Sequence, residues 1–158
     1  MKMNENLYRA KRKNWKNLSK GEWWVEGAYV VMHHNDKRTH LHHFIIPDGS
    51  DLSYGVKVED ILTEIDYDTL CRCTGKEYMD GEIAYEGDIY KNPRCGVVFV
   101  LKYGTYQAYC PADDAYMDSV GFYAEAEGYP QMPIGDLKEY GLKIGNIFDN
   151  SKLLADGK

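Results

Sequence analysis

The sequence lacks any hydrophobic run long enough to span a membrane. Its first residues, MKMNENLYRAKRK, also lack the apolar core of a secretory signal peptide. These two absences favour a protein that stays in the cytoplasm, with no membrane partner. In that compartment the four cysteines, Cys71, Cys73, Cys95 and Cys110, are expected to be reduced thiols and not a disulfide framework.

Familiar catalytic motifs are absent as well. The chain has no G-x-S-x-G nucleophile elbow, no glycine-rich phosphate loop, no dinucleotide-binding fingerprint and no H-E-x-x-H zinc motif. Paired carboxylates such as Asp113 and Asp114 lie in a polar loop, where solvation explains them. The sequence therefore predicts a protein that is not an enzyme and that needs no cofactor.

Tyrosine and glycine are abundant, with 14 and 15 copies among 158 residues. Tyrosine favours half-buried pleated surfaces, and glycine supplies turns and bulges, so the pair predicts a mainly β (β-rich α+β) fold. A chain of this length can bury a hydrophobic core without disulfide support.

Two β-hairpins are expected from the residue pattern. Residues 22–34 and 39–46 are rich in aromatic and β-branched residues and flank a polar turn at residues 35–38. Residues 96–103 and 105–110 form the second predicted hairpin, with Gly104 at its turn. A polar loop should follow at residues 111–119, and another strand at residues 120–126.

Two segments carry a family resemblance. Thr74-Gly75 is followed by DGEIAYEGDI at residues 80–89, and IGNIFDN at residues 144–150 is followed by Leu153-Leu154. In this order the chain resembles the YopX-like family of phage and prophage proteins. The resemblance implies a β-rich fold with a small SH3-like barrel in the C-terminal portion (residues 76–158) and a hairpin-rich N-terminal portion (residues 1–75), which can pack as one unit. It implies no established activity.

The motif residues themselves are interpreted as structural. Gly87 is expected to adopt a positive φ or bulge geometry, and Asp88 to accept hydrogen bonds from nearby backbone N–H groups. We expect residues 85–89 and 144–148 to be neighbouring β elements of one compact unit. The residues concerned are Tyr85, Glu86, Gly87, Asp88, Gly145 and Asn146.

All five histidines fall between positions 33 and 43. If the first hairpin turns on Asp36-Lys37, His33 lies opposite His40, and His42 shares their face. Three imidazoles on one face can bind Zn²⁺ or Ni²⁺, which makes His33, His40 and His42 a weak metal candidate. A solvated histidine face, or one at an oligomer contact, is the simpler interpretation.

Charge is distributed unevenly along a chain whose net charge is −6. The first 20 residues contain seven Lys or Arg residues and one Glu, so Arg9, Lys11, Arg12 and Lys13 are candidates for binding nucleic-acid phosphates. A strand and turn with solvated basic side chains is the alternative.

Aromatic side chains on the strands can form a binding surface for peptides or bases. The predicted platform comprises Trp23, Trp24, Tyr29, Tyr103, Tyr106 and Tyr109, and Trp23 and Tyr106 are the first candidates for exposure.

The preferred hypothesis is a protein-binding or adaptor module. Nucleic-acid binding through the basic segment and a metal-dependent role of the His33–His43 hairpin are the alternatives, and the partner and oligomeric state stay open.

Overall fold

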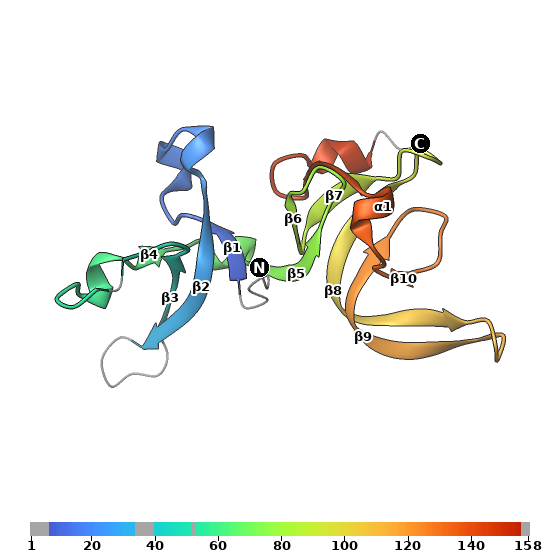
Figure 1. Cartoon of the computed structure of the whole chain (residues 1–158), viewed down its shortest axis with the longest axis horizontal. Helices are drawn as coiled ribbons and strands as arrows, with labels where there is room; N and C mark the ends of the chain where they lie inside the picture. Colours follow the sequence, from blue (N-terminus) through green and yellow to red (C-terminus); the bar gives the residue numbers. More distant parts are fainter. Residues whose placement is uncertain (1–6, 34–39, 52, 156–158) are drawn as a thin grey trace. The chain divides into compact units, whose positions relative to one another are not determined.

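The computed structural model describes residues 7–33, 40–51 and 53–155 (Figure 1). The chain is mainly β, with two curled half-barrel sheets, which confirms the predicted β-rich fold with small-barrel character. It divides into two compact units, Met1–Arg72 and Cys73–Lys158. No helix among the described residues is both long and apolar enough to cross a bilayer.

The first unit is built on an antiparallel sheet. Its strands are β1 (Leu7–Lys11), β2 (Trp24–His33), β3 (Leu41–Pro47) and β4 (Thr63–Glu64), in the order β4-β3-β2-β1. The first residues of β5 (Cys71–Glu77) pair with β1. Alternate residues of these strands face one side, where Ala10, Val25 and Ile45 form a core with Ile65, the residue after β4. Four 3₁₀ turns connect the strands: η1 (Trp15–Asn17), η2 (Lys20–Glu22), η3 (Val58–Asp60) and η4 (Tyr67–Thr69).

The predicted first hairpin exists, but its register is shifted by one residue. His33 pairs with Leu41, and Met32 pairs with His42. A shift of one residue places a side chain on the other face of a sheet, so His33 does not share the face of His42. The predicted turn at residues 35–38 lies outside the described residues.

The second unit contains a five-stranded antiparallel sheet in the order β10-β9-β8-β7-β11. Its strands are β7 (Asp88–Lys91), β8 (Val98–Cys110), β9 (Ala115–Glu125), β10 (Met132–Pro133) and β11 (Leu142–Asn146), and β6 (Ile83–Tyr85) pairs with β5. The short α1 (Leu137–Tyr140) and η5 (Ser151–Leu154) complete the unit. Tyr78, Ala84, Tyr90, Phe99, Leu101, Ala124 and Leu137 form its core.

The second predicted hairpin is corrected by the structure. Gly104 does not form the turn but lies inside β8, directly opposite Gly121 of β9. The turn is at residues 111–114, and β9 begins at Ala115, within the segment predicted to be a loop. The result is one long hairpin that changes direction midway and projects from the rest of this unit (Figure 1).

The family-like motifs meet as expected. Gly145 pairs with Ile89 and Asn146 pairs with Asp88, which confirms that the two segments are neighbouring β elements. Gly87 has a φ of +82°, and the Asp88 carboxylate, which is fully buried, accepts a 2.9 Å hydrogen bond from the backbone N–H of Tyr85. Both local predictions are confirmed.

Asn146 organises the turn that follows β11. Its side-chain oxygen accepts hydrogen bonds of 3.0 Å from the backbone N–H groups of Phe148 and Asp149. Its own N–H donates to the side chain of Asn150, which comes so close that a Cβ at Gly145 would lie 2.5 Å from the Asn150 oxygen. Asn146 and Gly145 therefore fix the shape of the turn that follows β11.

Candidate binding surfaces

The projecting half of the β8–β9 hairpin exposes a face on which aromatic and apolar side chains alternate with polar ones. Cross-strand neighbours on this face are Tyr103 and Phe122, Thr105 and Val120, Gln107 and Asp118, and Tyr109 and Tyr116. Val120 is 74% exposed and Tyr116 is 60% exposed. Scattered exposed apolar residues are ordinary, but here several of them lie together on one face of the hairpin.

Aromatic pairs stand at both ends of this face. The rings of Tyr103 and Phe122 are 4.9 Å apart in an edge-to-face arrangement, and those of Tyr109 and Tyr116 are 5.4 Å apart. Between them, the Gln107 side-chain amide donates a hydrogen bond to Asp118. These contacts hold the exposed side chains of the face in place.

The tip and face of the hairpin carry only negative charge. Residues 103–122 include Asp113, Asp114 and Asp118 but no Lys, Arg or His. At the tip, the Tyr109 hydroxyl donates a 2.8 Å hydrogen bond to Asp114, and this bond raises the pKa of Tyr109. We name the face formed by Tyr103, Thr105, Gln107, Tyr109, Tyr116, Asp118, Val120 and Phe122 the hairpin face.

Tyr106 lies on the opposite side of the same hairpin, and its predicted exposure needs correction. It is only 8% exposed and stacks on Tyr123, with ring centroids 4.9 Å apart. Strand alternation separates it from its neighbours in the chain, Tyr103 and Tyr109, which are exposed. The predicted platform thus contained two members of the hairpin face but also a tyrosine from the buried side, and it missed Tyr116 and Val120.

All three tryptophans of the chain surround Lys11. The ammonium of Lys11 lies 3.9 Å from the ring centroid of Trp15, 4.5 Å from that of Trp23 and 5.5 Å from that of Trp24. Lys11 is only 2% exposed. Attraction between a desolvated ammonium and aromatic faces offsets part of the cost of burying the charge. We call these four residues the lysine–tryptophan cluster.

Hydrogen bonds fix the positions of the Trp15 and Trp23 side chains. The Trp15 indole N–H donates to Asp66 over 3.2 Å, and the Trp23 indole N–H donates to the carbonyl of Leu18 over 3.0 Å. Trp23, the other candidate for exposure, is half-buried. Its ring is therefore divided between the cluster and the solvent.

The basic candidates do not form a free arm. Arg9 is buried, and its guanidinium lies 4.8 Å from the ring centroid of Trp24. Arg12 donates a 2.9 Å hydrogen bond to the carbonyl of Glu22, and Lys13 forms a 2.5 Å ion pair with Glu64. Burial against the tryptophan rings removes Arg9 and Lys11 from the surface where phosphates would be met.

The histidines are not gathered as the metal hypothesis requires. Among the described residues, no group of three His, Cys, Asp or Glu side chains is placed to hold a metal ion. His42 lies 3.3 Å from Glu64, whose pKa is lowered mainly by its hydrogen bond with Lys13 and further by His42. On the other face, the Nδ1 atom of His43 lies 2.6 Å from the hydroxyl of Tyr29, and its ring stacks on Tyr67.

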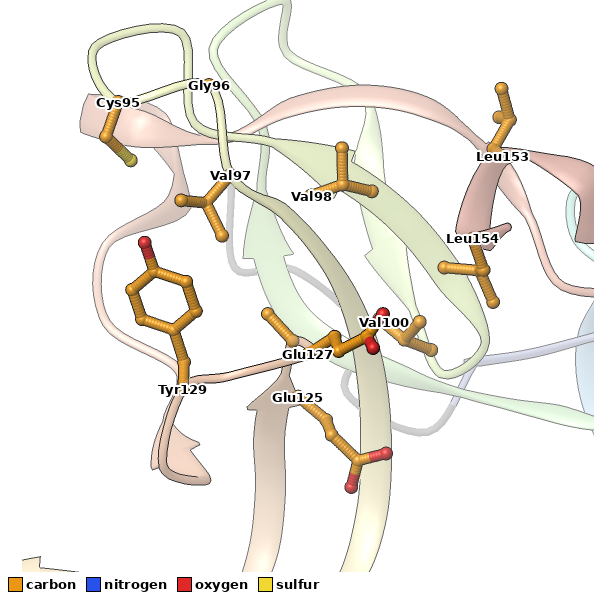
Figure 2. Close-up of a pocket in the computed structure, with 11 residues that line it drawn as sticks. Cys95, Gly96, Val97, Val98, Val100, Glu125, Glu127, Tyr129, Leu153 and Leu154 are labelled. Carbon is orange, nitrogen blue, oxygen red and sulfur yellow. The ribbon is translucent and has the colours of Figure 1, made fainter. Parts of the chain in front are cut away.

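A pocket of about 440 Å³ lies in the second unit at the start of β8 (Figure 2). Figure 2 shows Val98 and Val100 facing Leu153 and Leu154, with Tyr129 on the other side. Glu125 and Glu127 add two carboxylates. The pKa of Glu125 is lowered by hydrogen bonds from Lys102 and Gln131. No sequence motif indicated this pocket, since its walls come from three separate segments.

No protein-family model matches the chain, and no curated protein matches it either. The YopX-like resemblance therefore stays a prediction that rests on the two motifs.

Proposed function

We propose that this chain is a protein-binding or adaptor module, from a phage or an integrated element, that binds a basic segment of a partner protein on the hairpin face. The proposal depends on one observation: a projecting hairpin exposes Tyr103, Tyr109, Tyr116 and Val120 on one side while carrying three Asp residues and no basic residue. Tyrosine is enriched at protein interfaces, where its ring supplies contact area at low entropic cost.

Charge decides which class of partner fits. The negative potential of Asp113, Asp114 and Asp118 attracts Lys and Arg and repels nucleic-acid phosphates. It also opposes packing of this face against the same face of a second copy, because the two would bring six carboxylates together. A basic protein segment is the remaining complementary partner.

Photo-crosslinking tests the proposal directly. The photoreactive residue p-benzoylphenylalanine replaces Val120, and in a matched control it replaces Lys138, an exposed residue of α1. On irradiation of host cells, we expect a discrete crosslinked protein from position 120 and not from position 138. Mass spectrometry of the product should place the crosslink in a Lys- or Arg-rich segment. Equal crosslinking from both positions, or none from position 120, would contradict the proposal.

A further inference from the structure

The pocket in Figure 2 is shaped by three hydrogen-bonded turns. The first is the turn at residues 126–129, closed by a 3.2 Å hydrogen bond from the Tyr129 N–H to the Ala126 carbonyl, with Gly128 at a φ of +80°. A positive φ at the third position is the geometry of a type II turn. This turn places Glu127 and Tyr129 around the pocket.

The second turn places Val97 and Cys95 on the wall. The N–H of Gly96 donates to the Asn92 carbonyl over 2.8 Å, and the N–H of Asn92 donates to the Val97 carbonyl over 2.9 Å. The third is the η5 turn, where the N–H of Leu153 donates to the Asn150 carbonyl over 2.9 Å. The pocket is thus built from ordered backbone.

The two carboxylates of the pocket differ in their partners. Glu125 forms a 2.5 Å ion pair with Lys102 and accepts a 3.0 Å hydrogen bond from Gln131. The Glu127 carboxylate forms no hydrogen bond or ion pair with any residue that the structure describes. Figure 2 shows it reaching over the apolar floor toward Val100, between Tyr129 and Leu154.

We infer that this pocket binds an arginine side chain of the partner protein. The aliphatic stem of arginine fits against Val98, Val100 and Leu154, its guanidinium pairs with Glu127, and its planar face stacks on the ring of Tyr129. A volume of 440 Å³ falls in the range of about 300–1,000 Å³ typical of ligand pockets. Stacking on an aromatic ring favours guanidinium over ammonium.

Among the described residues, the positive charges near the pocket do not pair with Glu127. Lys102 is paired with Glu125, and Arg94 and Lys152 are exposed and flank the pocket in sequence. The inference rests on the proposed function, because it names the residue with which a basic partner would anchor itself. It concerns a different surface from the hairpin face, so the two can fail separately.

Amide NMR of the whole chain, titrated with butylguanidinium chloride, tests it. We expect saturable shifts confined to residues 95–100, 125–129 and 153–154, and E127Q should weaken binding about fivefold, as for one partly exposed charge pair. E139Q, in an exposed glutamate of α1, should leave binding unchanged.

Three results would overturn the inference. They are the absence of saturable shifts in these segments, an equal response to 1-pentanol or butylammonium, and unchanged affinity in E127Q. A V120T variant changes the hairpin face and not the pocket, so it should keep butylguanidinium binding. It therefore tests the pocket independently of the proposed function. If crosslinking at Val120 fails while butylguanidinium binds, the hairpin proposal is wrong and the pocket assignment stands.

Discussion

Gly104 of β8 lies directly opposite Gly121 of β9, and both have a positive φ, at +148° and +152°. They are the only positive-φ residues within these two strands. Residues with a Cβ rarely adopt this geometry, so we attribute the change of direction of the hairpin to this glycine pair.

Valine at either glycine should therefore destabilise the second unit. For G104V or G121V we expect a loss of about 1–3 kcal/mol in the free energy of unfolding, because each forces a strained φ on a β-branched residue. A Cβ at either position meets no atom within 4 Å, so the loss would come from the backbone and not from a steric clash. Urea unfolding measures this loss, with T105A as a control in the same strand. Midpoints equal to that of the control would mean that the hairpin does not depend on its glycine pair.

The two sides of the hairpin should respond differently to the same substitution. Y106T removes a buried ring stacked on Tyr123 and should cost about 3 kcal/mol. Y116T removes an exposed ring and should cost less than about 1 kcal/mol, the size of one cross-strand pair. Thermal unfolding of the two variants compares these losses directly. Similar losses for both would show that the assignment of buried and exposed sides is wrong.

Removal of the charge from the lysine–tryptophan cluster should destabilise the first unit. K11M keeps most of the side-chain volume but loses attraction to three rings, which we expect to cost about 1–2 kcal/mol. K16M is the control, because Lys16 is exposed and its ammonium lies farther away, 5.6 Å from the ring centroid of Trp15. Since all three tryptophans belong to the cluster, their fluorescence during unfolding reports on this unit. A K11M protein at least as stable as the wild type would mean that the free-energy cost of burying the ammonium exceeds its attraction to the rings.

Stability should fall at alkaline pH because of Tyr90. Burial raises the pKa of this tyrosine above that of an unfolded tyrosine, with a smaller contribution from Tyr140. A raised pKa in the folded state gives stability that is fully present below about pH 10, the unfolded value, and is lost as pH rises further. Y90F cannot ionise, so its melting temperature should fall less between pH 9 and pH 11 than that of the wild type. Y54F, at a fully exposed tyrosine, should behave like the wild type. A Y90F protein whose melting temperature falls as much as that of the wild type would contradict this prediction.

The sequence predicts most of the strands, but it does not predict which face of a strand is buried. Alternation assigns Tyr103 and Tyr106 to opposite faces, yet only the packing of Tyr106 on Tyr123 decides which face is buried. Glycine is common in turns, so the sequence favours a turn at Gly104, whereas the actual turn, at residues 111–114, is only the first part of the predicted loop.

The burial of the basic segment could not be predicted from the sequence either. Its charges indicated a surface, whereas Lys11 is enclosed by tryptophans from η1, from the residue after η2 and from β2, and their convergence depends on tertiary structure. The predicted register of the hairpin that carries the histidines is wrong for a similar reason. A difference of one residue in the hairpin register moves His33 to the other face, and no turn signal in the sequence fixes that residue.

Selection of a displayed random peptide library on an E127Q chain, in parallel with an E127Q/Y116T/V120T variant, tests the central claim most directly, because E127Q weakens the arginine pocket and leaves the hairpin face intact. The account predicts that the E127Q chain enriches peptides with a net positive charge and that the triple variant does not, with added salt weakening the binding of the selected peptides. Enrichment of neutral or acidic peptides, or equal enrichment by the triple variant, would contradict binding of a basic segment at the hairpin face.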